Sequence, residues 1–270
     1  MRQMNNVARV QTTLFKMFEG EFELVDVIRS IATERPWSAG VYVVKDSLQG
    51  RNYVYKTRQI FPQELVEIES MLLKLIDDPV QHFCRLVDFK LFNHSIHLLL
   101  DHVEGTSLDH SHDNYWNNDP TFSKYLSSLP SGIKVKIACQ LLESLDKLHR
   151  NNLIFQDLKT EQLIITPSYD LVIVDIDTIV LKGGLCASQV IWASPVCPPP
   201  SQSCCEYNDI YQAGCIIHEL FTAKHLTTEE KISFDMIDID KIVRKMTNNS
   251  LEKGYTTAKE VLDDLTQINI

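Results

Sequence analysis

The chain has 270 residues, which is enough for one large domain or for two smaller coupled lobes with a well-filled core. Hydrophobic residues make up 44% of the sequence and charged residues 23%, as in an ordinary soluble globular protein. The formal net charge of −10 argues against nucleic acid as the main partner, because phosphate binding needs a basic surface, and it permits a basic protein substrate.

Five segments of the first hundred residues have the composition or the alternation of β-strands: residues 22–28, 40–44, 52–56, 84–92 and 95–100. A polar stretch, 45–51, separates the second and third of them and predicts a hairpin. Residues 63–76 repeat apolar side chains at helical spacing, and Asp77-Asp78-Pro79 ends this helix. The sequence therefore predicts a small sheet that carries one helix.

The character of the chain changes at Asp101, and residues 101–107 are predicted to be a connector. A polar loop follows over residues 110–120. Four side chains of metal-binding type lie in or beside it: Asp109, His110, His112 and Asp113. Nothing fixes their geometry, so a solvated loop is favoured over a metal site. Helices are predicted for much of the remainder: residues 133–149, 209–221 and the C-terminal region to about Leu265.

The segment with the most chemical information is Phe155-Gln156-Asp157-Leu158-Lys159-Thr160-Glu161-Gln162. Asp175 follows eighteen residues after Asp157, behind an apolar run, so the two carboxylates are expected at the ends of neighbouring strands. Two carboxylates and a lysine suit phosphoryl transfer, in which a protein positions a hydroxyl, holds a metal and supplies charge. Either aspartate alone would be interpreted as a turn residue.

The order of these segments and motifs resembles the protein kinase superfamily over most of the chain. The resemblance implies an α+β, bilobal fold: a small antiparallel β-sheet with one helix over residues 1–100, and a larger, mainly α-helical lobe over residues 101–270. Short, diverged kinases of this kind are frequent in large DNA viruses, so a viral source is one interpretation of the sequence.

The resemblance also implies roles for single residues. Asp157 is similar to the catalytic aspartate that accepts or orients the substrate hydroxyl, and Lys159 to the lysine that neutralises the transferred phosphoryl group in Ser/Thr kinases. Asp175 resembles the aspartate that bridges magnesium to the phosphates of ATP. Asp209 is similar to an aspartate that braces the catalytic loop, and it is also expected to cap its own helix.

Four further residues are implied contacts of the nucleotide. Lys56 resembles the strand lysine that contacts the phosphates. Glu69 is the best candidate for its ion-pair partner, because apolar residues three, four and seven positions further on are expected to form an inward stripe, although a solvent-facing Glu69 is the alternative. The hinge residues Asp101 and Val103 would offer backbone groups to an adenine.

Two departures from the family's pattern concern the metal. Gln162 stands where the family has a second metal-binding asparagine, and its extra methylene would displace the amide oxygen by ~1.5 Å, which octahedral magnesium tolerates poorly. Gln162 would then bind through a water, or the site would use one metal or manganese. Asp177 replaces a glycine and adds a carboxylate beside Asp175, which either compensates for Gln162 or adds repulsion.

Other departures concern the nucleotide and regulation. Residues 30–40 contain one glycine where the family has a glycine-rich phosphate loop, which predicts weak nucleotide affinity. Phe155-Gln156 replaces the usual His-Arg, so loop phosphorylation is not expected to be the switch. Ser194-Pro195-Val196 is expected to close the activation segment, where Val196, or Cys197 after a one-residue shift, replaces a glutamate and Gly254 replaces its arginine partner.

The leading interpretation is a protein Ser/Thr kinase that uses ATP with Mg²⁺ or Mn²⁺ on a protein substrate. The alternative is a pseudokinase that acts as a binding scaffold or allosteric regulator of a partner protein, which Gln162, Asp177 and the missing glycines favour. A third is a small-molecule kinase of the aminoglycoside or choline type. Lys159 and the Ser194-Pro195 segment argue against this third function.

Cysteine usage and the N-terminus predict an intracellular protein. Seven irregularly spaced cysteines favour a reducing compartment over a disulfide framework. The segment Met1–Asn6 lacks the apolar core of a signal peptide, and no apolar run reaches the length of a membrane span. Cytosol or nucleus is therefore the expected location, with no membrane partner.

Overall fold

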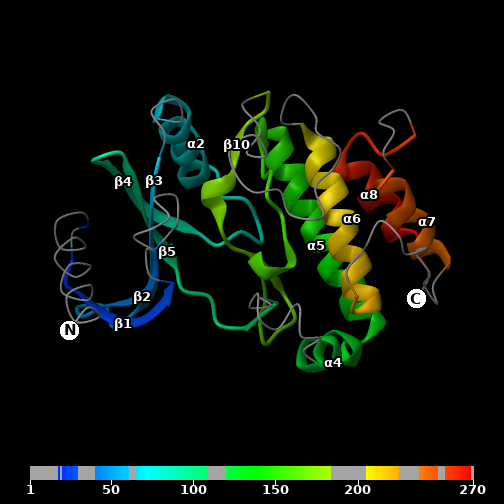
Figure 1. Cartoon of the computed structure of the whole chain (residues 1–270), viewed down its shortest axis with the longest axis horizontal. Helices are drawn as coiled ribbons and strands as arrows, with labels where there is room; N and C mark the ends of the chain where they lie inside the picture. Colours follow the sequence, from blue (N-terminus) through cyan, green and yellow to red (C-terminus); the bar gives the residue numbers. More distant parts are fainter. Residues whose placement is uncertain are drawn as a thin grey trace. The chain divides into compact units, whose positions relative to one another are not determined.

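Two compact units make up the chain in the computed structural model (Figure 1). One unit comprises Met1–Pro79 and Cys84–Val103, and the other comprises Val80–Phe83 and Glu104–Ile270. The structure describes eight stretches of the chain: residues 18, 20–29, 40–60, 65–108, 120–183, 205–224, 237–248 and 253–268. None of the described helices is both long enough and apolar enough to cross a membrane.

A five-stranded antiparallel sheet forms the first unit, as the sequence predicts. Its strands are, in spatial order, β1 (Phe22–Arg29), β2 (Gly40–Asp46), β3 (Asn52–Gln59), β5 (Ser95–Asp101) and β4 (Leu86–Phe92). The predicted hairpin joins β2 to β3. In its turn the carboxylate of Asp46 accepts hydrogen bonds from the backbone N–H groups of Leu48 at 2.8 Å and Gln49 at 3.0 Å, which fixes the reversal.

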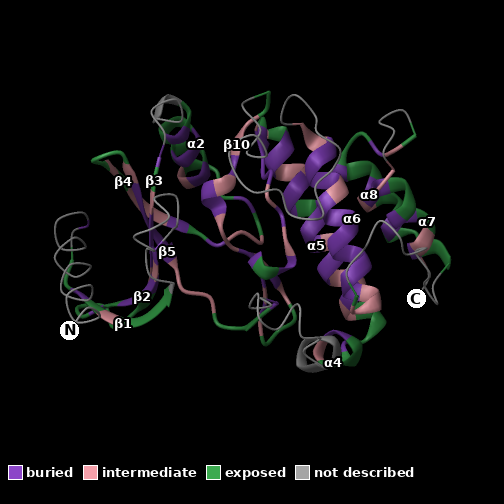
Figure 2. Cartoon of the chain, in the orientation of Figure 1, coloured by how far each residue is buried: buried purple, intermediate pink, exposed green. Residues whose placement is uncertain are grey.

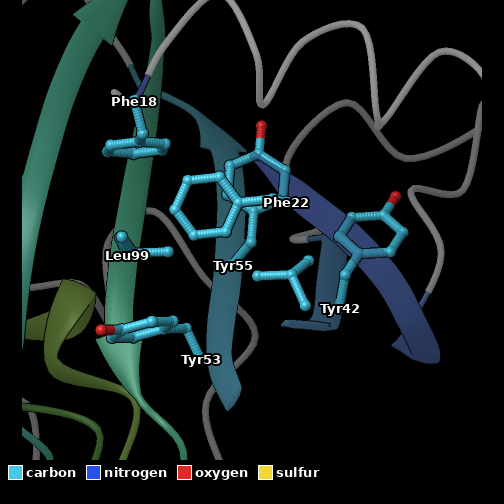
Figure 3. Close-up of a cluster of buried hydrophobic side chains, with 7 residues drawn as sticks. Phe18, Phe22, Tyr42, Tyr53, Tyr55 and Leu99 are labelled. Carbon is cyan, nitrogen blue, oxygen red and sulfur yellow. The ribbon is translucent and has the colours of Figure 1, made fainter. Parts of the chain in front are cut away.

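Aromatic side chains fill a core on this sheet (Figure 3). The cluster contains seven buried residues: Phe18, Phe22, Tyr42, Val44, Tyr53, Tyr55 and Leu99. Tyr55 lies at its centre, stacked on Tyr42 at 5.8 Å between ring centroids, and its hydroxyl is 2.7 Å from Nδ1 of His97, so the buried phenol has a partner. Successive side chains of a strand point to opposite faces, and this packing of Tyr55 therefore places Lys56 on the other face of β3.

Helix α2 (Leu65–Asp77) packs against β4 in the same unit. From residue 67 onward, where the burial of its side chains is described, four residues at helical spacing form its buried stripe: Ile68, Met71, Leu72 and Leu75. The helix ends at Asp77, two residues before Pro79, as the sequence predicts, because the residue before a proline avoids the helical region.

The second unit is mainly helical. Its helices are α4 (Pro120–Ser128), α5 (Ser131–Arg150), α6 (Glu206–Thr222), α7 (Ile237–Met246) and α8 (Ala258–Thr266). Helix α5 packs against α6 and α8, and the inner faces of α5 and α6 are almost entirely buried (Figure 2). The sequence missed α4, because Pro120 was assigned to the end of a polar loop. A proline suits the first helical position, where its missing N–H would have no partner within the helix.

Short strands of the second unit frame the segments with the candidate catalytic residues. Strand β7 (Leu153–Ile154) pairs with β10 (Val180–Leu181), while β8 (Leu163–Ile165) lies between β6 (Thr106–Ser107) and β9 (Leu171–Ile173). The expectation that Asp157 and Asp175 follow neighbouring strands is wrong, because β7 and β9 belong to different sheets. Strands of two or three residues carry too little sequence to specify their partners.

Candidate active site

The segment between β7 and β8 is a tight loop that ends in a short 3-10 helix, η2 (Thr160–Gln162). Gln156 has a φ of 69°, a left-handed conformation that is uncommon for a residue with a side chain. The N–H of Asp157 donates to the carbonyl oxygen of Phe155 at 3.0 Å, which closes the turn at the predicted catalytic aspartate. Such a conformation persists only where the surrounding structure holds it.

Asp209 on α6 holds the first half of this loop. Its carboxylate is fully buried and accepts hydrogen bonds from the N–H of Phe155 at 2.8 Å and the N–H of Gln156 at 2.9 Å. Nε2 of His149 lies 2.8 Å from the same carboxylate. The bracing role implied by the resemblance is therefore confirmed. The expected helix cap is wrong, since Cys205 occupies the capping position and the carboxylate of Asp209 is taken up by the loop.

Gln212, three residues after Asp209 on α6, holds the second half of the loop. Its Nε2 donates to the carbonyl oxygen of Gln156 at 2.7 Å, and its Oε1 accepts from the N–H of Leu158 at 3.1 Å. Sequence reasoning missed this residue. The available signal was its spacing, because residues three apart lie on the same side of a helix.

Glu219 adds a third polar contact from α6 to the same region. The hydroxyl of Thr160 donates to its carboxylate, and both side chains are buried. Glu219 lies seven residues after Gln212, which is two helical turns, so the side chains of Asp209, Gln212 and Glu219 share one side of α6. The helix therefore acts as the template on which the loop is built.

Asp157 and Lys159 form an ion pair on the loop that α6 holds. Nζ of Lys159 lies 2.9 Å from Oδ2 of Asp157 and 3.7 Å from Oε1 of Glu161. Burial raises the pKa of Asp157 above its ordinary value. The ammonium group of Lys159 opposes the rise, and the negative charges of Glu161 and Asp177 add to it. A carboxylate with a raised pKa accepts a proton near neutral pH more effectively than an ordinary aspartate.

Gln162 lies between the catalytic loop and Asp175. Its Oε1 accepts a hydrogen bond from the N–H of Lys159 at 2.8 Å, and its Nε2 is 3.5 Å from Oδ2 of Asp175. Because an amide nitrogen cannot accept from a backbone N–H, the bond to Lys159 decides which end of the amide is the oxygen. The oxygen that would bind a metal is therefore bonded to the loop, and the NH₂ group lies toward Asp175.

Asp175 has a φ of 73° and directly precedes the 3-10 helix η3 (Ile176–Thr178), whose Thr178 hydroxyl donates to the carbonyl oxygen of Asp175 at 3.2 Å. Asp177 is buried within η3. The second unit thus contains five of the predicted site residues, linked by contacts or by charge: Asp157, Lys159, Gln162, Asp175 and Asp177.

The predicted nucleotide contacts of the first unit begin with Lys56, which lies on β3 and is only 6% exposed. Glu69 is exposed on α2, which is the alternative that the sequence left open. The expected inward stripe of apolar residues on the side of Glu69 is wrong, because Leu73, four residues further on, is 47% exposed. The buried stripe of α2 follows Ile68 and Leu72 instead.

The predicted hinge residues lie at the end of β5. The N–H of Asp101 donates to the carbonyl oxygen of Arg85 at 3.0 Å, and the thiol of Cys84 donates to the carbonyl oxygen of Asp101 at 3.1 Å. The Asp101 carboxylate is 2.9 Å from the guanidinium of Arg51. Val103, two residues on, is half-buried.

Several predicted features lie outside the described residues. They are the phosphate-loop segment 30–39, the polar loop 109–119 with Asp109, His110, His112 and Asp113, and the end of the activation segment at Ser194-Pro195-Val196 with Cys197. Gly254 is described and lies in the turn before α8.

The donor set fits a magnesium ion that binds together with nucleotide phosphates. Such ions are held by one or two carboxylates plus phosphate oxygens and water. Asp175 and Asp177 supply two carboxylates within three residues. In the described ranges, no cluster of three or more His, Cys, Asp or Glu side chains could hold a metal ion by itself. The phosphates would therefore have to supply the remaining ligands.

Comparison with known families agrees with this geometry. The family model for the protein kinase domain matches residues 37–269, which is well over half of the chain and includes all the candidate site residues. No curated protein matches the chain. The matched region contains the loop held on α6, the helices that the structure describes and every strand of the first unit's sheet except β1, which precedes it. The chain therefore belongs to the protein kinase domain family.

Proposed function

We propose that this protein is a protein serine/threonine kinase, which transfers the γ-phosphoryl group of ATP to a hydroxyl of a protein substrate. Kinase-type phosphoryl transfer, with ATP and Mg²⁺, is the general activity of the family. The observation that carries the proposal is the ion pair of Asp157 and Lys159, 2.9 Å apart on a loop that α6 holds in place. A protein with no catalytic use for this loop gains little from holding a half-buried carboxylate there.

Asp157 is the proposed base. It orients the substrate hydroxyl and accepts its proton, and its raised pKa improves it for that role. Lys159 lies beside it, where its ammonium group neutralises the charge of the phosphoryl group in transfer. A lysine at this position is the feature of the resemblance that favours serine and threonine as the substrate hydroxyls.

Asp175 and Asp177 are the proposed metal ligands, and Lys56 is a proposed phosphate contact. Bound Mg²⁺ or Mn²⁺ would neutralise negative charge on the phosphates of ATP. The side-chain oxygen of Gln162 is bonded to the loop, so we propose Asp175 as the principal ligand. The N–H of Asp101 is used by Arg85, so we propose as adenine contacts the carbonyl oxygen of Asp101, which has a second lone pair beside its bond to the Cys84 thiol, and the backbone groups of Val103.

A pseudokinase that acts as a scaffold or regulator of a partner protein is the second candidate function. The orientation of Gln162 favours it, because the amide oxygen that the family uses for a second metal is bonded to Lys159. A pseudokinase would still bind ATP or a partner protein, but it would transfer no phosphate.

Transfer of labelled phosphate separates the candidates. The purified chain is incubated with γ-labelled ATP and Mg²⁺ or Mn²⁺, and a basic protein, an acidic protein and an aminoglycoside are offered in parallel. We expect labelling of protein, and a loss of about 10²–10⁴-fold in Asp157→Ala, because general-base catalysis contributes about that much. Stabilisation of the chain by ATP and metal should survive this substitution, since Asp157 is not a proposed ligand.

The control is Asp170→Ala, which removes an exposed carboxylate in the turn before β9 and should leave transfer unchanged. Nucleotide-dependent stabilisation with no transfer to any substrate would favour the pseudokinase. Transfer that persists in Asp157→Ala would contradict the proposed role of Asp157, and labelling of the aminoglycoside alone would contradict a protein substrate.

A further inference from the structure

The amide of Gln212 bonds both peptide groups that flank the α-carbon of Asp157. Nε2 donates at 2.7 Å to the carbonyl of Gln156, which belongs to the peptide group before Asp157. Oε1 accepts at 3.1 Å from the N–H of Leu158, which belongs to the peptide group after it. Peptide groups are planar, so fixing both planes fixes the two backbone dihedrals of Asp157 between them. The direction of its Cα–Cβ bond is thus set by one side chain of α6.

We propose that Gln212 is the positioning residue of Asp157, which holds the aspartate in the orientation that phosphoryl transfer requires. This inference rests on the proposed function of Asp157 as the base. Gln212 touches neither of the reacting groups in this scheme and acts only through the backbone of the loop. Its effect on the rate comes from geometry, because a misplacement of about 1 Å costs as much as ~10²-fold in a reaction that depends on orientation.

The other described hydrogen bonds of the loop do not hold both peptide groups that flank Asp157. Asp209 bonds the N–H groups of Phe155 and Gln156, both of which precede the aspartate. The N–H of Asp157 itself is used within the turn, by the carbonyl oxygen of Phe155. After Asp157, apart from the bond of Gln212 to Leu158, the first backbone group held by a side chain is the N–H of Lys159, which donates to Gln162. Only the amide of Gln212 bridges the two sides of Asp157 in the described part of the loop.

A carboxamide is the side chain that this position needs. Gln212 is 3% exposed, so water does not replace its hydrogen bonds. The carbonyl of Gln156 needs a donor and the N–H of Leu158 needs an acceptor, and one amide group supplies both. A carboxylate can only accept hydrogen bonds. A hydrocarbon side chain of the same length forms none, and a thioether is at most a weak acceptor.

The chain contains a matched control in Gln140 on α5. This side chain is 8% exposed, and its Oε1 accepts from the N–H of Leu171 at 2.8 Å while its Nε2 donates to the carboxylate of Asp170 at 3.1 Å. Gln140 is therefore a second buried glutamine that ties a loop to a helix through one donated and one accepted hydrogen bond. The loop it holds is the turn before β9, which carries no proposed catalytic residue.

The first test compares Gln212→Met with Gln140→Met in the full chain. Methionine keeps the length of the side chain and removes both hydrogen bonds, so we expect similar falls in the unfolding temperature. Gln212→Met should lower kcat by about 10- to 100-fold and change KM for ATP by no more than about twofold. Gln140→Met should leave both constants near those of the wild type.

The second test does not depend on activity. Amide hydrogen exchange is followed at single residues in the same two variants. Exchange at Leu158 should become about tenfold faster in Gln212→Met, the effect of losing one hydrogen bond of typical strength, while Phe155 and Gln156 keep the protection that Asp209 gives them. In Gln140→Met the faster amide should be Leu171.

The outcomes separate this inference from the proposed function. A lower kcat together with local exchange at Leu158 supports the positioning role. An unchanged kcat in Gln212→Met, with the same loss of stability as in Gln140→Met, overturns it, because Gln212 would then be only structural. A wild-type chain that transfers no phosphate overturns the proposed function. Exchange at Leu158 then still decides whether Gln212 holds Asp157, since unchanged exchange would overturn that as well.

Discussion

Asp157 combines its proposed catalytic role with a cost to stability. Burial raises its pKa, so at neutral pH the folded state has to keep a desolvated charge that the unfolded chain exposes to water. The ion pair with Lys159 offsets part of this cost, and only part, because both side chains remain partly exposed and exposed pairs contribute little.

The substitution Asp157→Asn removes that charge. We expect an unfolding temperature at pH 7 that matches or exceeds the wild-type value by up to a few degrees, together with a loss of transfer activity. The advantage should shrink as the pH falls through the raised pKa of Asp157, because the wild-type carboxylate then becomes neutral too. Thermal unfolding of both proteins between about pH 4 and pH 7 measures this, and a mutant less stable than the wild type at pH 7 would contradict it.

Single residues of the site differ in how far the sequence could identify them. Asp157, Lys159 and Asp175 stand in short motifs with distinctive spacing, and the second unit contains them together. Gln212 stands in no such motif: its spacing of three residues from Asp209 places it on the same side of α6, but its contact with a loop 54 residues earlier in the chain is visible only in the fold. The apolar residues three, four and seven positions after Glu69 predict an inward face, but Leu73 is exposed, because the face that a helix buries is decided by its neighbours in the fold.

At the scale of elements, the two sides of α6 make different kinds of contact, hydrogen bonds on one side and close packing on the other. One side carries the polar residues that hold the catalytic loop, while Gly214 lies where the helix meets the end of α7. A Cβ atom on Gly214 would lie 2.8 Å from Cβ of Met246 and 2.9 Å from Cγ2 of Thr247. The glycine therefore permits a close approach that any other residue would prevent.

The substitution Gly214→Ala should destabilise the chain although alanine favours a helix. Overpacking costs ~1–3 kcal/mol and exceeds the gain in helix propensity of ~1 kcal/mol. The matched control is Gly132→Ala in α5, where an added Cβ meets nothing within 4 Å and a gain of up to ~1 kcal/mol is expected. Urea unfolding of the two variants decides the matter. Equal changes in both would show that close packing at Gly214 has no energetic role.

Elements with a long, regular pattern were predicted well. The helix expected at 133–149 is α5 at Ser131–Arg150, and the five expected strands of the first unit are all present. Helix α4 was missed because its first residues continue a polar stretch, so composition outweighed the signal of Pro120. The pairing of β7 with β10 and of β8 with β9 depends on contacts across the fold, which no local pattern records.

At the scale of the whole molecule, the net charge of −10 affects encounter with substrates. A basic peptide is attracted by the field of an acidic protein, and salt screens that attraction. We expect kcat/KM for a peptide rich in lysine and arginine to fall by about tenfold between roughly 0.05 and 0.5 M NaCl. A neutral peptide of the same length is the control and should change little. Equal salt dependence for both peptides would rule out electrostatic steering.

The fold class could be predicted from the order of the elements, a sheet of strands followed by a run of helices, and the family match agrees with it. The orientation of the Gln162 amide could not be predicted from the sequence. The sequence predicted the length of its side chain and hence a poor metal ligand, whereas the direction of its amide follows from the N–H of Lys159, which only the folded loop presents.

The long separation between the loop and α6 also has a consequence for biosynthesis. Phe155 and Asp209 are 54 residues apart, and His149 and Asp209 are 60 apart. Contacts this distant in sequence form late, since the entropy of closing the intervening chain opposes them. A nascent polypeptide that has emerged from the ribosome as far as β9 lacks the helix that maintains the left-handed turn at Gln156. Catalytic competence would therefore arrive only after α6 has been translated and docked.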